Sequence, residues 1–343
     1  MFLLLVACTH VTLHDDTRLN IDPFGSDVSL ASPYLIGAQF EFLLDGPEAE
    51  ISAYTLESMD AGVLTVGPGV LQMSESEDED DRYMTFEATA VGEGDTEILV
   101  FDGDGVEVLR GDVAVEVPDR VEFRAASELE ETENPDPVEN PACYVGGESA
   151  FRVDFFHGNT QLAGAGGLGV DDRGQSVATP DDSVWPDDAD WVVVAPQKNG
   201  DYTVGISTGG TEVTELSFTG VGDAGIDHID ARRDTESGAE EGDHLAVHAW
   251  GELDDDSRVY GLSFEWTENG TFLADVGDTY TYEYDPDVNT TVTASAAGQV
   301  MQLEVHGYGD VSDSNSMACA VVNAGPVAMG VLLTLLGVRR KRR

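Results

Sequence analysis

Apolar side chains recur at every second position in short segments through the last third of the chain, and this alternation is the strongest constraint on the fold. Successive side chains of a strand point to opposite faces of a sheet, so alternation predicts strands with one buried face. Turn sequences such as Glu268-Asn269-Gly270 separate the segments, which predicts an antiparallel sandwich. The alternating residues are Leu245, Val247 and Ala249; Tyr260, Leu262, Phe264 and Trp266; Tyr280, Tyr282 and Tyr284; Val292, Ala294 and Ala296; and Met301, Leu303 and Val305.

Three turn glycines repeat at the spacing of one small domain. Gly94, Gly200 and Gly298 each lie in a turn that leads into alternating apolar positions, and they are 106 and 98 residues apart. Extended segments starting at Pro118 and Gly225 keep nearly the same period. An immunoglobulin-type sandwich has about 100 residues. We therefore predict an all-β chain of three tandem sandwiches, over residues 20–118, 119–223 and 224–312, followed by a C-terminal hydrophobic helix.

The first unit resembles the bacterial immunoglobulin-like (Ig-like) domains of surface proteins. The resemblance rests on Tyr54–Asp60, on the segment Gly62–Val66 and on the turn at Gly94. The third unit is similar to the same superfold or to its polycystic-kidney-type relative, and Trp266 stands where an Ig-like fold often places a core tryptophan. The Ig cysteine pair is absent. The resemblance implies a structural or adhesive surface protein rather than an enzyme.

The charge of the chain excludes one class of function. Acidic residues number 67 against 16 basic ones, giving a net charge of −51, and five of the basic residues are the last five, Arg339 to Arg343. Binding to nucleic acid needs basic patches that neutralise phosphates. We therefore expect no nucleic-acid partner.

The N-terminus resembles the signal segment of bacterial lipoproteins. Leu5-Val6-Ala7-Cys8 follows the lipobox pattern, in which the cysteine is acylated after cleavage, so residues 1–8 are interpreted as a short lipoprotein-type signal with Cys8 as the lipidation site. The apolar run is shorter than usual and no basic residue precedes it. The alternative is a cysteine placed there by chance.

The C-terminus combines a cysteine, an uncharged apolar segment and a basic end. Residues 320–338 are long enough to cross a bilayer as a helix. The basic residues 339–343 then predict a cytoplasmic end and an extracytoplasmic body. With Cys319 just before the span, the tail resembles a myxobacterial-type sorting signal; a plain membrane anchor is the alternative. We expect a body anchored in the cell envelope through lipid, helix or both, at the cell surface or in the periplasm.

Several residues are candidates for binding metal ions or sugars. Asp102, Asp104 and Glu107 place carboxylates in a tight turn, which suits calcium, although Asp-Gly pairs are also common in hairpins. Asp171–Asp172 and Asp254–Asp256 present the same alternatives. His244 and His248 share a strand face, but no third zinc ligand is evident, so they are interpreted as surface histidines. Trp185 and Trp191 would stack on sugars if the chain binds carbohydrate.

Two glycine motifs match catalytic or cofactor patterns by letter only. The run Gly164–Gly169 fits a dinucleotide fingerprint, and Gly205–Gly209 fits a nucleophile elbow, but neither is followed by a helix. The acidic segments Ser74–Asp81 and Ser127–Asn140 are interpreted as loops. A Cys143–Cys319 disulfide remains an alternative to a free Cys143. We predict a non-catalytic surface protein with no cofactor except, in one alternative, calcium. Its expected partner is an unknown surface protein or polysaccharide, and a carbohydrate- or calcium-dependent binding module is the second hypothesis.

Overall fold

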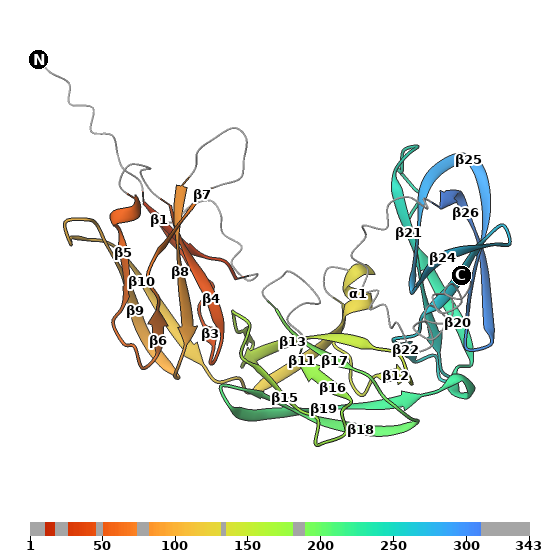
Figure 1. Ribbon diagram of the computed structural model, residues 1–343, viewed down its shortest axis with the longest axis horizontal. Coiled ribbons are helices and arrows are strands. Elements are labelled where there is room, and N and C mark those ends of the chain that lie inside the picture. Colours follow the sequence, from red (N-terminus) through yellow and green to blue (C-terminus); the bar gives the residue numbers. More distant parts are fainter. Residues whose placement is uncertain are drawn as a thin grey trace, which may run out of the picture. The chain divides into compact units, whose positions relative to one another are not determined.

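The computed structural model describes residues 11–17, 27–45, 51–73, 82–131, 135–180 and 189–309. The chain forms two compact units (Figure 1). The first contains residues up to His228 together with Trp250–Leu262, and the second contains Ile229–Ala249 together with residues from Ser263 on. In the described ranges, helix is confined to α1 (Ala126–Glu131) and two 3-10 turns, η1 (Ile51–Ala53) and η2 (Asp223–Gly225). The prediction of a β fold is therefore confirmed for the described residues, and the predicted C-terminal helix lies outside them.

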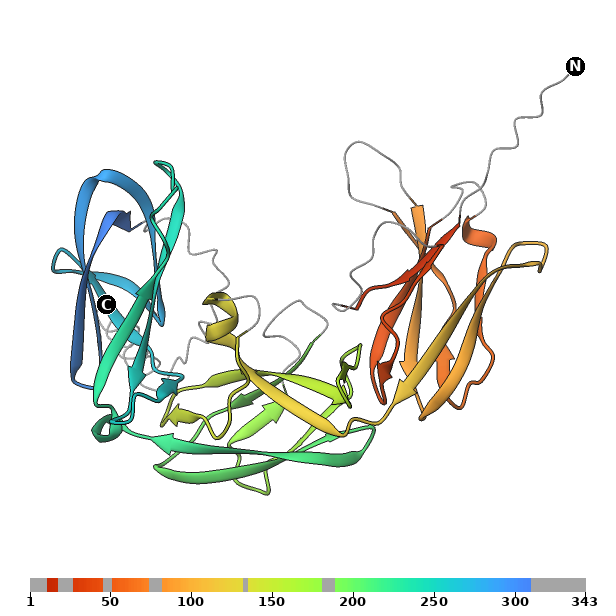
Figure 2. The same ribbon diagram turned by 180° about the vertical axis from the view of Figure 1, so that it is seen from behind.

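The first unit begins with a sandwich of two sheets, whose strands can be followed from both sides in Figures 1 and 2. One sheet has the order β2-β1-β4-β8-β6, with β7 also on β8, and the other has the order β3-β10-β9-β5. The strands are β1 (Thr12–Asp15), β2 (Val28–Ser29), β3 (Tyr34–Leu35), β4 (Gln39–Asp45), β5 (Thr55–Ser58), β6 (Leu64–Val66), β7 (Val70–Met73), β8 (Arg82–Ala90), β9 (Gly94–Phe101) and β10 (Glu107–Glu116).

Alternation decides which faces of these strands meet. Phe40, Phe42 and Leu44 of β4 are buried, while Gln39 and Asp45 are exposed. The facing sheet buries a matching set that includes Ile98, Val100, Val113 and Val115. Each buried aromatic or branched side chain contributes about 1.5–3 kcal/mol, so this apolar layer between the sheets fixes their pairing.

A second sandwich in the first unit repeats the same strand pattern. One sheet has the order β11-β13-β17-β16, with β14 also on β13. Within the first unit the other has the order β15-β18-β19-β12-β22, in which β22 (Arg258–Tyr260) pairs in parallel with β12. The strands are β11 (Arg120–Ala125), β12 (Ala142–Tyr144), β13 (Ser149–His157), β14 (Thr160–Gln161), β15 (Leu168–Asp171), β16 (Ala178–Pro180), β17 (Asp190–Val194), β18 (Gly200–Thr208) and β19 (Thr211–Val221).

Both sandwiches have the strand order of an Ig-like fold. In each, the chain starts in one sheet and then crosses to the other, where a short strand pairs in parallel with the last strand: β3 with β10, and β12 with β19. If the main strands are lettered in chain order, one sheet is A-B-E-D and the other is A′-G-F-C, the arrangement of immunoglobulin sandwiches. These are β1-β4-β8-β6 and β3-β10-β9-β5 in the first sandwich, and β11-β13-β17-β16 and β12-β19-β18-β15 in the second. A repeated connectivity of this kind agrees with tandem Ig-like domains.

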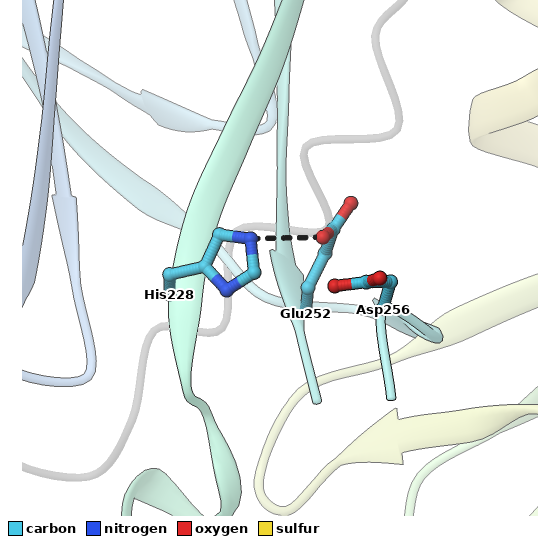
Figure 3. Close-up of side chains that lie close together, drawn as sticks. All are labelled: His228, Glu252 and Asp256. Carbon is cyan, nitrogen blue, oxygen red and sulfur yellow. Dashed lines mark ion pairs between the residues drawn. The ribbon is translucent and has the colours of Figure 1, made fainter. Parts of the chain in front are cut away.

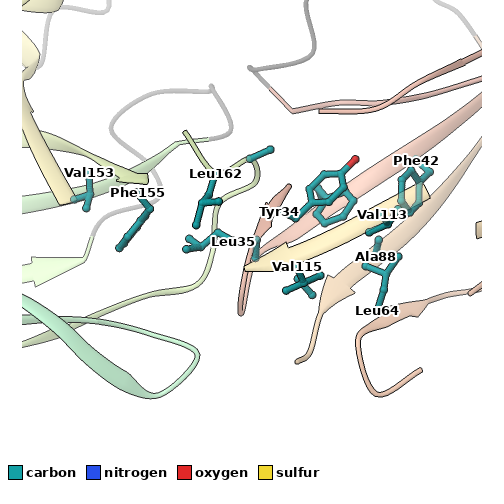
Figure 4. Packing of buried hydrophobic residues seen from close by; sticks show 14 of the residues in the cluster. Tyr34, Leu35, Phe42, Leu64, Ala88, Val113, Val115, Val153, Phe155 and Leu162 are labelled. Atoms are coloured by element: carbon teal, nitrogen blue, oxygen red, sulfur yellow. The ribbon is translucent and has the colours of Figure 1, made fainter. Parts of the chain in front are cut away.

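The two sandwiches of the first unit are joined by backbone hydrogen bonds as well as by apolar contacts. Leu35 N–H donates to the Ala163 carbonyl at 2.9 Å, and Gln39 N–H donates to the Ala165 carbonyl at 2.7 Å. The buried apolar residues of both sandwiches form one continuous cluster. Figure 4 shows Leu35 and Leu162 between the apolar side chains of the two sandwiches.

Glycines allow the close approach at this junction. A Cβ added at Gly37, whose φ is +87°, would lie 3.0 Å from the Gly209 nitrogen, and one added at Gly167 would lie 3.0 Å from the Gly37 carbonyl carbon. The buried Thr208 hydroxyl donates to the Ile36 carbonyl at 2.6 Å. Backbone therefore packs directly on backbone between the two sandwiches.

The second unit contains antiparallel strands around an aromatic core. Trp266 is 1% exposed, and its ring lies 6.2 Å from Phe264 and 5.6 Å from Tyr280. The prediction of Trp266 as a core residue is confirmed. The strands from β20 on are β20 (His228–Arg233), β21 (His244–Glu252), β22 (Arg258–Tyr260), β23 (Phe264–Glu268), β24 (Thr271–Gly277), β25 (Thr279–Ala296) and β26 (Gln299–Gly309). Of these, β22, the first residue of β20 and the last residues of β21 belong to the first unit.

Three local predictions were wrong in detail. The segment Tyr260–Trp266 is divided between β22 and β23, because Gly261 adopts a φ of +75°. Tyr280–Tyr284 and Val292–Ala296 belong to one strand, β25, whose pairing with β26 is irregular between Tyr284 and Asn289. Part of the predicted loop Ser127–Asn140 is helix α1, since its Glu and Leu residues favour helix.

Other predictions fall partly or wholly outside the described residues. These are the signal segment 1–8, the acidic run Ser74–Asp81, the segment 320–338 and the basic end 339–343. No helix in the described ranges is long and apolar enough to span a membrane. The first sheet already includes Thr12–Asp15, which precedes the expected domain start at residue 20.

Candidate functional site

Three metal-ligating side chains meet where the chain leaves the first unit and returns to it. His228 begins β20, Glu252 ends β21, and Asp256 lies in the turn between β21 and β22 (Figure 3). His228 Nε2 lies 3.0 Å from Glu252 Oε2. One ligand atom from each of the three residues lies within 4.8 Å of the other two. Within the described ranges, this is the one group of three such side chains that meets this spacing.

Hydrogen bonds hold the histidine and the glutamate of this group. His228 Nδ1 lies 3.2 Å from Asp227 Oδ2, and Trp250 Nε1–H donates to Glu252 Oε1 at 2.7 Å. The Asp227 N–H donates to the Glu252 carbonyl at 2.8 Å, which holds the two chain segments side by side. The hydrogen bond to Asp227 and the nearby negative charges of Glu252 and Asp256 raise the pKa of His228. The His228 ring therefore lies in a negatively charged environment.

The predicted calcium ligands of the β9–β10 hairpin serve its turn instead of converging on one point. Asp102 Oδ1 accepts the N–H groups of Asp104 at 3.0 Å and Val106 at 2.8 Å. Glu107 pairs with Arg110, whose Nε lies 3.0 Å from Glu107 Oε1. This geometry is that of a hairpin turn capped by an aspartate. Calcium binding by Asp102, Asp104 and Glu107 remains a prediction.

The Asp171–Asp172 pair also caps a turn. Asp171 Oδ1 accepts the N–H of Arg173 at 2.9 Å, and Asp172 accepts the N–H groups of Gly174 and Ser176 at 2.7 and 2.8 Å. Their carboxylates therefore stabilise the backbone of the loop between β15 and β16.

Two side chains that were predicted to be exposed are buried. His248 is 8% exposed and its Nδ1 lies 3.2 Å from Thr279 Oγ1, whereas His244 is exposed. Trp191 is 3% exposed because it packs against Ala126 and Ala189, so it is not available to stack on a sugar. Trp185 lies outside the described residues.

Neither glycine motif has the surroundings of a catalytic site. β15 begins within the Gly164–Gly169 run, so the run leads into a strand and not into a helix that could bind a pyrophosphate. Ser207 donates its hydroxyl hydrogen to the Gly169 carbonyl at 3.1 Å rather than to a base. Gly209 and Gly210 form the β18–β19 hairpin turn.

An open hollow of about 500 Å³ lies on the first sandwich. Its polar lining includes Asp60, Asp95, Glu97 and Asp112, and it contains no histidine or cysteine. Ser32, the one serine that lines it, has its oxygen bound by the Ala114 N–H at 2.8 Å.

Cys143 is buried and free among the described residues. Burial raises the pKa of its thiol to about 12, so at neutral pH it is neither a nucleophile nor a metal ligand. The lipidation candidate Cys8 and the sorting candidate Cys319 lie outside the described residues, as does any Cys143–Cys319 bridge.

Sequence reasoning considered Asp254–Asp256 but missed His228. Between His228 and Glu252 the chain passes through Ile229–Ala249 of the second unit. No local sequence pattern therefore joins the two residues. The available signal was weak: one His and one acidic turn at the two crossings between units.

Comparison with known proteins gives only distant structural similarities. No family model and no curated protein matches the chain. It is similar to domains 1–6 of the surface-layer protein SbsC, at 14% identity over 88% of this chain and 41% of that chain, with a TM-score of 0.31. It is similar to FdeC, an Escherichia coli adhesin, at 10% identity over 88% of this chain and 97% of that chain, with a TM-score of 0.25.

A third solved structure is invasin, a bacterial integrin-binding protein. The identity is 15% over 87% of this chain and 59% of that chain, and the TM-score is 0.23. All three similarities are to bacterial surface proteins. Because the identities and scores are low, the proposals below rest on this chain's own residues.

Proposed function

We propose that this chain is a non-catalytic protein of the cell surface with a structural or adhesive role. In this proposal the first unit is a rigid spacer made of two Ig-like sandwiches. The second unit and the loops at the sandwich ends are then available for contacts with a surface protein or a polysaccharide.

The junction between the two sandwiches is the observation that carries the proposal. A flexible string of domains has linkers with few contacts, whereas here the buried core is continuous and backbone groups bond across the junction. Thr208, which is 1% exposed, makes one of these bonds through its side chain. A spacer of this kind holds its two ends at a set separation without any chemistry of its own.

The described polar side chains support a non-catalytic role. The hydroxyl of Ser207 is bound to a carbonyl, and the Cys143 thiol is buried with a raised pKa. Acyl transfer needs a nucleophile within hydrogen-bonding reach of a base, and neither residue has such a partner.

Attachment to the envelope is assigned in this proposal to the ends of the chain. Cys8 would carry the lipid, residues 320–338 would span or be sorted at the membrane, and Cys319 would mark the sorting site. The net charge of −51 keeps such a body soluble and repels non-specific contacts with anionic surfaces.

An epitope inserted beside Gly105 tests the surface location. Gly105 lies in the β9–β10 turn, where an added Cβ would meet nothing within 4 Å, so the insertion leaves the core intact. We expect antibody to label intact producing cells, and external protease to remove the signal, while a cytoplasmic marker stays unlabelled. Deleting the protein should reduce attachment or envelope integrity. An epitope that antibody reaches only in permeabilised cells would refute the surface role.

A further inference from the structure

We propose that His228, Glu252 and Asp256 bind a divalent transition-metal ion of the zinc type. The ion would fasten β20 to the β21–β22 hairpin on the side of the first unit. This site is independent of the surface role proposed above.

The three side chains are positioned by backbone contacts. The Asp227 N–H bonds to the Glu252 carbonyl at 2.8 Å, which sets the start of β20 against the end of β21. The turn after β21 is closed by the bond from Leu253 N–H to the Ser257 carbonyl at 3.0 Å. Asp256 has a φ of +64° in this turn, a conformation that aspartate tolerates better than most residues.

The turn does not use the carboxylate of Asp256. Asp255 Oδ1 accepts the Ser257 N–H at 3.1 Å and so caps the turn. Asp256 instead contributes its carboxylate to the group with His228 and Glu252 (Figure 3). This differs from Asp102 and Asp172, whose carboxylates accept backbone N–H groups.

The surroundings of His228 match those of a metal-binding histidine. Asp227 lies at Nδ1, 3.2 Å away, so Nδ1 can keep its proton when a metal ion replaces the proton that Nε2 shares with Glu252. Histidine ligands of metals usually donate their second ring N–H to a carboxylate in this way. Asp227 is therefore an outer-shell residue of the proposed site.

The ligand types select the class of metal. Calcium and magnesium prefer oxygen ligands alone, whereas one imidazole and two carboxylates suit zinc and neighbouring transition metals. Three protein ligands leave coordination positions for water. His228 is 45% exposed and Glu252 is 13% exposed, so an ion can reach the site from solvent.

One basic residue, Arg258, neighbours the group and contacts Trp250 and Glu128. Arg258 lies opposite Glu252 in the β21–β22 pair. Its guanidinium carbon lies 4.5 Å from the centre of the Trp250 ring, and its Nη1 lies 3.8 Å from Glu128 Oε1. The negative charges of Glu252 and Asp256 both act on His228.

Zinc titration of the full chain tests the proposal. The titration uses a competing chelator at about 0.15 M salt, where screening weakens diffuse attraction to the acidic surface. We expect one tight zinc ion per chain, and a visible ligand-field band when Co²⁺ replaces it. H228A, E252Q and D256N should each weaken binding at least about tenfold, and D227N should weaken it about 10-fold or more, as outer-shell changes do.

Asp254→Asn is the matched control, because it removes one exposed carboxylate from the same turn outside the group. It should leave zinc affinity within about twofold of the parent, and so should His244→Ala. Protection of the buried Cys143 thiol shows that each variant is folded. If D254N weakens binding as much as D256N, if H228A binds zinc like the parent, or if calcium competes on equal terms, the proposal is overturned.

Discussion

Replacing Gly37 by alanine should loosen the junction between the two sandwiches of the first unit. The new Cβ would lie 3.0 Å from the Gly209 nitrogen and 3.2 Å from the Gly209 Cα. Both of these atoms are backbone, so no flexible side chain can move aside. The φ of +87° at this position also disfavours alanine.

The expected cost follows from a matched control. Gly105 has a φ of +77° and nothing within 4 Å of an added Cβ, so Gly105→Ala measures the backbone effect alone. That effect is about 1–2 kcal/mol of strain, reduced by about 0.4–1 kcal/mol through lower entropy of the unfolded chain. Gly37→Ala adds the close contact, for which about 1–3 kcal/mol is typical of overpacking.

Amide hydrogen exchange at Ala163 measures the effect where it should occur. Ala163 belongs to the second sandwich, and its N–H donates to the Pro33 carbonyl of the first sandwich at 3.0 Å. If opening of the junction exposes this amide, the added cost of about 1–3 kcal/mol accelerates exchange about 5- to 150-fold. Gly105→Ala should leave the rate unchanged. Equal rates in both variants would show that the sandwiches are not coupled through Gly37, and the rigid-spacer argument would fail.

Three further predictions concern buried or paired groups. Cys143, whose pKa is raised to about 12 by burial, should resist alkylation at neutral pH and react fully in urea; fast reaction of the folded chain would contradict its burial. Asp154→Ala removes a carboxylate that is 1% exposed in its ion pair with Arg124, so the free energy of unfolding measured in urea should fall by about 3–5 kcal/mol. R110A, at an exposed pair, should leave the free energy of unfolding unchanged. Burial acts to raise the pKa of Glu236, but the hydrogen bonds with His306 and nearby positive charge lower this pKa below its ordinary 4.5. The ionised Glu236 therefore stabilises the fold above pH 4.5, and this stabilisation is lost as the pH falls through the lowered pKa. Glu236→Gln should flatten this dependence of the unfolding free energy on acid pH.

The alternation of apolar residues predicted strands well because each strand buries its own face. Leu245, Val247 and Ala249 lie in β21, and Met301, Leu303 and Val305 lie in β26, as the period of two requires. The same pattern contains no information on strand length. For this reason the pattern did not show that β25 continues from Tyr284 to Asn289. The residues between them, where the pairing with β26 is irregular, were interpreted as a break between two strands.

Burial of single side chains and contacts distant in sequence were harder to predict. Trp191 was interpreted as an exposed aromatic that would stack on a sugar if the chain binds carbohydrate. It packs with the neighbouring Ala189 and with Ala126 of α1, which is distant in sequence. His228 approaches Glu252 through a backbone bond between β20 and β21, and such pairing is decided by the whole fold rather than by neighbouring residues.

The acidic residues of this chain divide by what their carboxylates bind. At Asp102, Asp172 and Asp255 the carboxylate accepts a backbone N–H within the next few residues. These aspartates are therefore explained by the many tight turns that a chain of short strands requires. An acidic turn in such a protein is weak evidence for a bound cation, since its charge already has a structural use.

Asp256 is informative because this explanation does not apply to it. Its neighbour Asp255 already caps the turn, and Asp256 adopts a positive φ that brings its carboxylate to His228 and Glu252. A side chain that the turn does not require, held beside an oriented histidine, is the type of residue whose removal should affect metal binding more than folding. The contrast between D256N and D254N therefore separates a specific metal site from general acidity in the same turn.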